Sequence, residues 1–323
     1  MTDFWQKRTK SGFLWFGLLL LFGSHLVGCD SRPVERIDLS QRAGDPGLSQ
    51  AVWETSEEVL LFSFETHTVP QEDAKRYIPL IQYLNQTTGF NFELRFTPYN
   101  QDLGQDLGQG VIHFAQMGGA AYIRAREEYG VVALVHELNY ESKSQCRSVI
   151  IVPPGSPIQN IEEIAGRTFA FGSPLSTDDY LMPRIHLFKH GITLAELAGY
   201  EFTESGYEAV SAVAAGQFDA AGVSDWVGQR YAAEGLVKII HHTDTFPSCC
   251  IVAHQNLPPD LIEEVKRALI AYRLAESVVS GDRPLIANPL AGFSEAKDED
   301  YDELRTWWRR FHSPASENEG ETP

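Results

Sequence analysis

The feature that most constrains the fold is an alternation of short apolar runs with amphipathic stretches, which starts near residue 59 and restarts near residue 148. The apolar runs, such as 59–64 (VLLFSF), have the pattern of buried strands, and the stretches between them show helical spacing, as in 71–87. Alternation of this kind predicts α/β architecture, with mainly parallel sheets flanked by helices. The restart predicts two such lobes.

The pattern also predicts where the chain passes between the lobes. A strand at 251–253 looks like a return to the first lobe, so lobe 1 is expected to comprise 58–145 plus 251–312, and lobe 2 to comprise 146–250. Two crossings of this kind are typical of proteins that close by a hinge. The predicted strands are 59–64, 92–96, 111–115, 131–137, 148–152, 168–171, 220–223, 237–241 and 251–253, and the main predicted helices are 71–87, 178–190, 207–215 and 258–280.

The N-terminal segment is typical of export. A basic start and an uncharged apolar run within residues 1–28 predict a signal peptide, since the run is short for a membrane span; a plain membrane anchor is the alternative. Small residues lead into Cys29, as in a bacterial lipobox, which implies cleavage before Cys29 and its lipidation. The polar composition of 29–57 predicts a flexible tether, and that of 313–323 a disordered tail.

Charge and cysteine content narrow the function. The net charge is −18, from 26 Lys and Arg against 44 Asp and Glu, which excludes binding driven by phosphate neutralisation of nucleic acid. A small anionic ligand remains compatible, because backbone dipoles can hold it. After Cys29 only Cys146, Cys249 and Cys250 remain, an odd number that leaves one thiol over if one disulfide forms in an oxidising compartment.

The segment 172–183 (GSPLSTDDYLMP) carries the most chemistry. A strand delivers the chain into a turn, and a helix is predicted to start at Ser176 or Thr177. Free backbone N–H groups, a positive dipole end and two hydroxyls then suit an oxyanion. The alternative is an ordinary N-cap by Ser176 or Thr177, which serves only local stability.

Further segments that share an order with a known family are 77–89, 110–125, 147–158, 161–183, 205–220 and 292–301. Together they resemble the phosphate-, phosphite- and phosphonate-binding periplasmic proteins of ABC importers, over about residues 58–310. The resemblance implies the type II periplasmic binding protein fold, without cofactor or catalysis, in a monomer that works with a permease and an ATPase. Asp30 resembles a signal for retention at the inner membrane, so the protein is expected on its periplasmic face, anchored through Cys29.

The resemblance implies ligand contacts residue by residue. The family has Ser-Thr-Ser-Gly at the anion-binding helix start, where this chain has Ser176-Thr177-Asp178-Asp179. The Asp178 carboxylate would repel a dianion unless a protonated ligand oxygen donates to it or the side chain points away. Tyr207 stands where the family often has His. The ligand contacts implied in the other lobe are Met117, Gly118, Phe64 and Glu65.

The same comparison leaves alternatives open. Cys249 stands where aminophosphonate binders have an acidic residue, which disfavours that ligand unless Glu208 or Asp225 substitutes. Hinge strands of this fold lie side by side, which implies a disulfide from Cys146 to Cys249 or to Cys250.

Other functions are weighed against the importer. A sensor input for a membrane kinase would keep the same fold with a different small ligand. A hydrolase would use Cys249 or the carboxylates of Asp178, Asp179 and Asp225. No metal site is predicted, since His241-His242 and Cys249-Cys250 lack a zinc-binding spacing.

Overall fold

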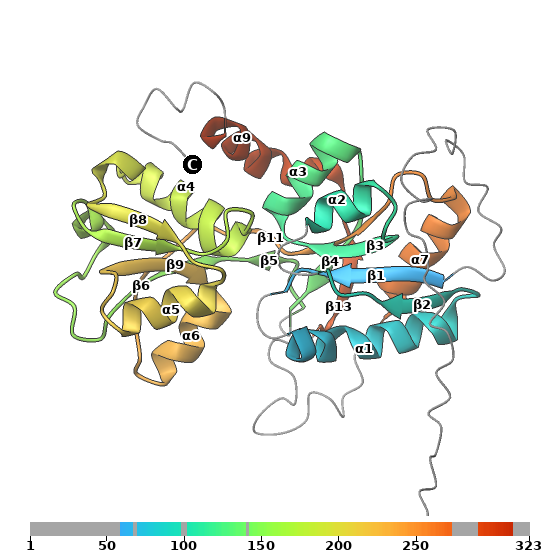
Figure 1. Ribbon diagram of the computed structural model, residues 1–323, viewed down its shortest axis with the longest axis horizontal. Helices are drawn as coiled ribbons and strands as arrows, with labels where there is room; N and C mark the ends of the chain where they lie inside the picture. Colours follow the sequence, from blue (N-terminus) through green and yellow to red (C-terminus); the bar gives the residue numbers. More distant parts are fainter. Residues whose placement is uncertain (1–58, 67–69, 98–101, 140–141, 273–289, 313–323) are drawn as a thin grey trace, which may run out of the picture. The chain divides into compact units, whose positions relative to one another are not determined.

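The computed structural model describes residues 59–66, 70–97, 102–139, 142–272 and 290–312, which form two mixed sheets with helices on both faces (Figure 1). The predicted signal peptide (1–28), Cys29, the tether (29–57) and the C-terminal tail (313–323) lie outside the described residues. The first sheet has six strands in the order β13-β4-β12-β3-β1-β2. They are β1 (Val59–Phe64), β2 (Asn91–Leu94), β3 (Phe114–Met117), β4 (Val132–Leu138), β12 (Cys250–Ala253) and β13 (Gly292–Glu295).

Helices bury both faces of the first sheet. On one face α1 (Pro70–Thr87) and α7 (Pro259–Ala271) place Tyr77, Leu80 and Val265 against the strands. On the other face lie α2 (Leu103–Gly108), α3 (Gly119–Tyr129) and, after a 3₁₀ turn, α9 (Asp302–Phe311). Apolar side chains from the strands therefore point into two separate cores, as expected for strands whose successive residues alternate between faces.

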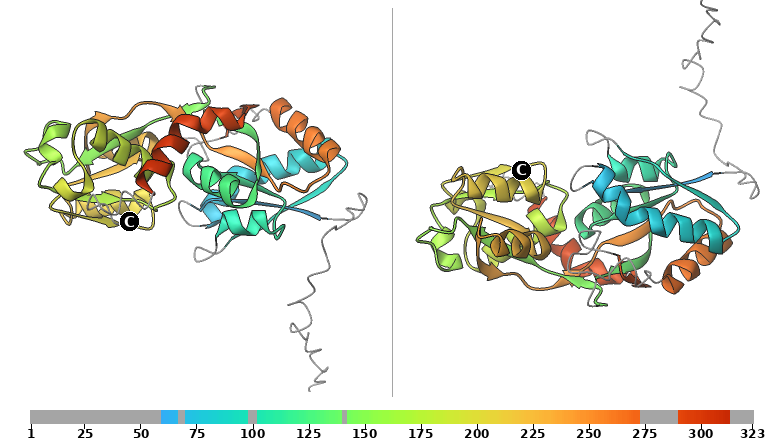
Figure 2. Two further views of the ribbon diagram at one scale, coloured as in Figure 1. Left: turned by 90° about the horizontal axis from the view of Figure 1, so that it is seen from above. Right: turned by 90° about the horizontal axis from the view of Figure 1, so that it is seen from below.

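The second sheet has five strands in the order β10-β6-β9-β7-β8. One face carries a π-helical turn, Thr177–Leu181, that continues into α4 (Met182–Lys189); the other carries α5 (Gly206–Ala214) and α6 (Asp225–Ala233), as Figure 2 shows from both sides. Short 3₁₀ turns occur at Ile161–Ile164, Leu194–Glu196 and Asp298–Tyr301. The strands are β6 (Ser148–Val152), β7 (Thr168–Phe171), β8 (Gly199–Phe202), β9 (Ala220–Ser224) and β10 (Lys238–His242).

A two-stranded antiparallel ribbon accompanies the passage between the sheets. It pairs β5 (Gln145–Cys146) with β11 (Phe246–Pro247), with Cys146 opposite Phe246. The chain then enters the first sheet as β12, where Cys250 lies between Met117 of β3 and His136 of β4. The ribbon lies within a few residues of the predicted lobe boundaries at 145/146 and 250/251, and the predicted strand 251–253 begins one residue earlier, at Cys250.

The strand directions correct one expectation. The α/β fold class and the repeated alternation are confirmed, but the sheets are mixed rather than mainly parallel. In the first sheet only the β1–β2 and β1–β3 pairs are parallel, and in the second only β7–β8 and β7–β9. Strands that border the passage, such as β12 and β6, run antiparallel to both neighbours, because the chain enters them from the opposite end of the sheet.

Some element bounds also differ from those predicted. The helix predicted over 178–190 begins as the π turn at Thr177, and the helix predicted over 258–280 ends at Ala271, before residues outside the described part. The strand predicted over 111–115 begins only at Phe114.

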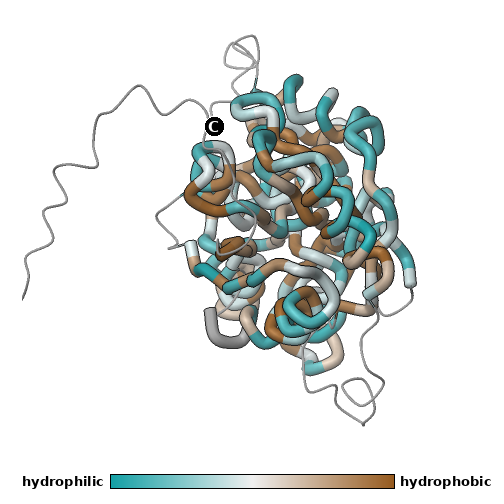
Figure 3. Tube along the Cα trace, turned by 90° about the vertical axis from the view of Figure 1, so that its right-hand side faces the viewer, coloured by the Kyte–Doolittle hydropathy of each residue, from teal (hydrophilic) through white to brown (hydrophobic). Residues whose placement is uncertain are grey.

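Aromatic contacts join α9 to α4. Phe188 of α4 packs edge-on against Trp307 and Phe311, and the guanidinium of Arg184 lies 4.0 Å from the Phe311 ring centroid. The hydropathy of the trace fits this packing, since apolar segments run mainly through the interior and hydrophilic ones along the outside (Figure 3). Among the described residues, no helix combines the length and apolarity needed to cross a membrane.

Candidate functional site

Ser176 begins the turn that the sequence singles out. Its backbone is extended, and its hydroxyl accepts a hydrogen bond from the Asp179 N–H at 2.9 Å. The backbone carbonyl of Ser176 accepts from the Leu181 N–H at 3.0 Å, which is the i to i+5 pattern of a π turn. The N-cap role that the sequence suggests is therefore realised by Ser176.

Thr177 instead reaches the start of α3. Its hydroxyl, 2% exposed at the residue level, accepts from the Ala120 N–H at 2.8 Å and so caps a helix 57 residues away. The N-cap position of α3, Gly118, has no side chain to cap the helix itself. A hydroxyl that accepts one hydrogen bond still has a proton to donate, so Thr177 can donate a hydrogen bond to a ligand oxygen at this point.

Glu65 completes the surroundings of Gly118. Its Oε2 atom accepts from the Gly118 N–H at 2.9 Å. A Cβ atom added at Gly118 would lie 3.2 Å from the Thr177 hydroxyl and 3.3 Å from the Glu65 carboxylate. Close approach of two oxygen atoms thus favours glycine here, and the structure brings Glu65, Gly118 and Thr177 together. Their contact with a ligand stays a prediction.

The charge of Asp178 acts on two thiols of the crossing segments. Burial, followed by the carboxylates of Asp178 and Glu137, raises the pKa of the Cys146 thiol. Burial is also the main cause of the raised pKa of the Cys249 thiol, followed by the carboxylates of Glu137, Asp178 and Glu65. Asp178 and Glu137 therefore act on both thiols.

A half-buried cation, Arg76, lies beside one of these carboxylates, Glu137. Arg76 of α1 donates to Glu137 of β4 at 2.7 Å, and the Tyr77 hydroxyl donates to the same carboxylate at 3.2 Å. Sequence reasoning missed this cluster, because residues about 60 positions apart are brought together only when α1 packs on the first sheet.

Asp179 has a structural role that sequence reasoning also missed. Its buried carboxylate accepts from the Gly206 N–H at 3.1 Å and from the Ser224 N–H at 2.9 Å, where α5 and α6 begin. Both helix starts carry partial positive charge, so a carboxylate is stabilised there. The nearby Gly172 and Gly206 have no room for a Cβ beside Asp179. The two glycines were the signal of this close approach that the sequence offered.

Tyr207 lies at the start of α5, half-buried. Burial raises the pKa of its phenol; Arg230 lowers that pKa, and Tyr231, Asp73 and Asp179 raise it. The Tyr207 ring packs edge-on against Tyr231 of α6, with ring centroids 6.2 Å apart. The phenol remains protonated at neutral pH and can donate a hydrogen bond.

Two of the predicted contacts lie in apolar cores. The Met117 side chain is fully buried with residues of α3 and α9, and Phe64 stacks on Tyr77 with ring centroids 4.7 Å apart. Ligand contact by either side chain stays a prediction, and burial indicates packing as its main task.

Cys146, Cys249 and Cys250, the cysteines within the described residues, are free thiols. Cys146 and Cys249 are half-buried, and Cys146 is among the groups that raise the pKa of Cys249. Cys250 is fully buried, and its thiol lies 3.7 Å from the Met117 carbonyl. The disulfide that the resemblance implies stays a prediction.

The site thus lies where two mixed sheets flanked by helices are joined by an antiparallel passage, and where helix starts meet around hydroxyls. A family model described as "ABC transporter, phosphonate, periplasmic substrate-binding protein" matches residues 62–301. The chain belongs to this family, and it is therefore a periplasmic substrate-binding component of an ABC transporter.

Solved structures agree on the fold. A binding protein component of an ABC phosphonate transporter from Pseudomonas aeruginosa is similar with a TM-score of 0.66 and 19% identity, over 77% of this chain and 85% of the other. PhnD1 from Prochlorococcus marinus, solved with methylphosphonate, gives 0.66 and 17%, over 78% and 97%. The aliphatic sulphonate binding protein SsuA from Escherichia coli gives 0.56 and 16%, over 82% and 88%.

Membership of this family also removes one of the functions weighed above. Its members are substrate-binding proteins of transporters, so the hydrolase alternative, with Cys249 or the aspartates as catalytic groups, is discarded. The family assignment also implies that the protein works with a permease and an ATPase.

Proposed function

We propose that the chain captures a small phosphorus oxyanion, namely a phosphonate, phosphite or phosphate, at the meeting point of α3 and the Ser176–Thr177 turn. The observation that supports this most directly is the hydrogen bond from the Ala120 N–H to the Thr177 hydroxyl. It brings the positive ends of two helical segments from the two sheets to one place, where an oxyanion gains from both dipoles.

Ligand contacts follow from this placement. The hydroxyls of Ser176 and Thr177 and the phenol of Tyr207 donate to the anion, and Gly118 allows its close approach. Closure of lobe 1 (58–145 plus 251–312) over lobe 2 (146–250) then excludes water and strengthens these hydrogen bonds.

Acidic neighbours select the ionisation state of the ligand. Two unit charges 4 Å apart interact by about 4 kcal/mol at an effective dielectric constant of 20, so a dianion beside Glu65 or Asp178 is strongly disfavoured. A monoprotonated oxyanion avoids half of this repulsion and can donate its proton to a carboxylate. We therefore expect the monoanionic form to bind.

Isothermal titration of the full chain in a mild detergent tests the proposal. The ligands are phosphate, phosphite, methylphosphonate, aminoethylphosphonate, sulfate and methanesulfonate, each at about pH 5.5 and about pH 8, which bracket the second ionisation of a phosphoryl group. We expect one phosphorus anion to bind with micromolar or tighter affinity, and more tightly at the lower pH, where it carries a proton. Sulfate and methanesulfonate have no proton to donate, so we expect them to bind more weakly.

Variants assign the site. Ser176→Ala should weaken binding about tenfold, equivalent to the loss of one hydrogen bond of about 1.4 kcal/mol. Thr193→Ala is the matched control, because Thr193 caps a 3₁₀ turn elsewhere through a capping box. Failure of every phosphorus anion at both pH values would refute the ligand class while leaving the family assignment intact.

The membrane anchor is a separate proposal. We infer that cleavage before Cys29 and lipidation of its thiol tether the protein to the periplasmic face of the inner membrane, next to the permease and its ATPase. The sequence leading into Cys29 supports this. Mass spectrometry of the N-terminal peptide should find a lipid-modified cysteine, and Cys29→Ser should release the protein into the soluble fraction or leave the signal peptide uncleaved.

A further inference from the structure

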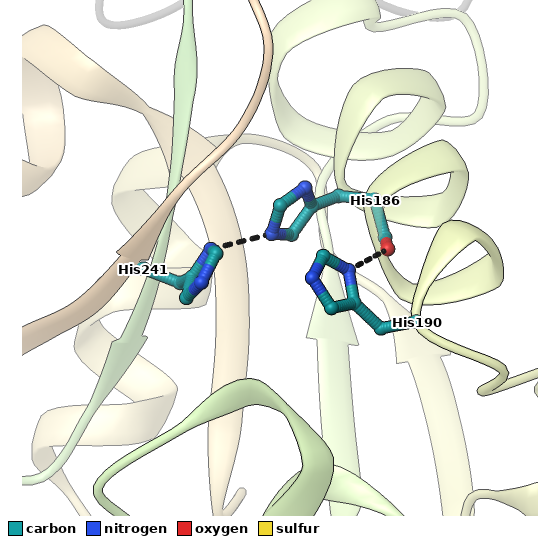
Figure 4. Close-up of side chains that lie close together, drawn as sticks. All are labelled: His186, His190 and His241. Atoms are coloured by element: carbon teal, nitrogen blue, oxygen red, sulfur yellow. Dashed lines mark hydrogen bonds between the residues drawn. The ribbon is translucent and has the colours of Figure 1, made fainter.

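Three histidines that the sequence holds apart lie together on the second sheet. His186 belongs to α4, His190 ends that helix, and His241 belongs to β10. Each offers one ring nitrogen, and these nitrogens all lie within 4.8 Å of one another (Figure 4). The Nε2 atom of His186 is 2.6 Å from the Nδ1 atom of His241.

Backbone geometry explains the cluster. His186 and His190 are four residues apart, so they lie on the same side of the helix. His241 follows an irregularity in the pairing of β10 with β6, between Ile239 and His241, and a bulge of this kind re-aims the side chain that follows it. Since α4 packs over this sheet, the re-aimed ring meets the helix.

Hydrogen bonds decide which ring nitrogens of the three histidines can bind a metal. The Nδ1 atom of His190 lies 2.9 Å from the His186 carbonyl oxygen, so it carries the proton and leaves the Nε2 lone pair free. A carbonyl that holds the remote ring N–H is the usual support of a metal-bound histidine. Between His186 and His241 one proton must be shared, and a cation can replace it.

Burial and neighbouring charges act on His186. Burial, together with His190 and His241, lowers the pKa of His186 to about 4. Asp244, just after β10, adds a negative charge close to His186, while Lys189 of α4 is held by Asp244 at 2.8 Å and reaches Glu303 at 3.9 Å. The charge of Lys189 is thus paired with carboxylates.

We propose that His186, His190 and His241 bind one divalent transition-metal ion, with Zn²⁺ as the probe. Three imidazoles suit zinc, copper and nickel, and a tetrahedral site keeps a fourth position for water. His190 is exposed, so this position is open to solvent. The ion would join α4 to β10 at the edge of the second sheet, apart from the Ser176–Thr177 turn.

Titration of the full chain, without an affinity tag and in detergent, with Zn²⁺ tests this. We expect one ion per chain, a rise of the melting temperature with Zn²⁺ and its reversal by EDTA. His190→Gln and His241→Gln should each weaken binding about tenfold or more. His242→Gln is the matched control, since it alters the next residue of the same strand and should leave binding unchanged.

A second readout separates histidines from thiols. Co²⁺ in place of Zn²⁺ should give tetrahedral d–d absorption without a thiolate charge-transfer band. The proposal is overturned if no ion binds, if a thiolate band appears, or if both histidine variants bind as tightly as the unaltered chain; the rings then form only a hydrogen-bonded aromatic cluster.

Discussion

At the scale of single residues, Asp179 offers the sharpest test of stability. Its carboxylate satisfies the N–H groups of Gly206 and Ser224. Asp179→Ala leaves both donors unpaired, at about 1–3 kcal/mol each, so we expect the free energy of unfolding to fall by about 2–6 kcal/mol. Urea denaturation measures this. The exposed Asp260→Ala should change stability by less than about 0.5 kcal/mol, and equal losses in the two variants would contradict the assigned role.

Gly206 depends on the same carboxylate. A Cβ atom at this position would lie 2.6 Å from an oxygen of Asp179, in contact with a side chain that two hydrogen bonds fix. We expect Gly206→Ala to cost about 1–3 kcal/mol in urea denaturation. Gly155→Ala is the matched control, because open space surrounds Gly155 and its φ is not left-handed. There we expect no loss, or a gain of about 0.4–1 kcal/mol.

Sequence reasoning located part of the site at this scale. Ser176 was predictable as a cap, since hydroxyls before a helical stretch serve that purpose locally. The partner of Thr177 was not, because Ala120 belongs to a helix of the other sheet and no spacing rule links the two. Asp179 was grouped with Asp178, yet its neighbours make it a structural carboxylate.

At the scale of elements, the buried pair His113 and His254 makes the first sheet sensitive to acid. The Nδ1 atom of His113 accepts from the Leu61 N–H at 2.9 Å, between β1 and the start of β3. Burial and the neighbouring His254 lower the pKa of His113 from 6.5 to about 4. Between these values the unfolded chain binds the proton and the folded one does not, so this stability is complete above about pH 6.5 and declines toward pH 4.

His113→Asn tests this dependence. The amide oxygen can replace Nδ1 as acceptor but does not titrate. The variant should be less stable at pH 7 because it packs less well, and should lose less stability than the unaltered chain between about pH 7 and about pH 4.5. Urea midpoints at several pH values measure this. Identical pH profiles would show that His113 contributes nothing to acid sensitivity.

The sequence predicted whether a segment is a helix or a strand better than it predicted the direction of each strand. Apolar runs and helical spacing identified most strands and helices, because burial imposes those periods locally. Strand direction depends on where the chain enters a sheet, as β12 and β6 show, and hydrophobicity does not encode it. The π turn at Thr177 depends likewise on packing against α3.

At the scale of the whole molecule, the passage between the sheets holds two thiols that a disulfide would join. Cys249 and Cys250 are successive residues, so their side chains point to opposite faces. The Cys250 thiol points into the core beside Met117, whereas Cys249 lies near Cys146 and Glu137. Cys249 is therefore the partner we expect for Cys146.

We expect exposure of the reduced chain to oxidised glutathione to produce a Cys146–Cys249 disulfide, with two glutathione thiols released, and to leave Cys250 reduced. The reaction should be slow, because burial and the carboxylates of Asp178 and Glu137 raise the pKa of Cys146, and the thiolate is the attacking species. Asp178→Asn removes one of these charges and should accelerate it. Peptide mapping after alkylation identifies the bond, and a Cys146–Cys250 linkage, or the same rate in Asp178→Asn, would contradict this arrangement of the crossing.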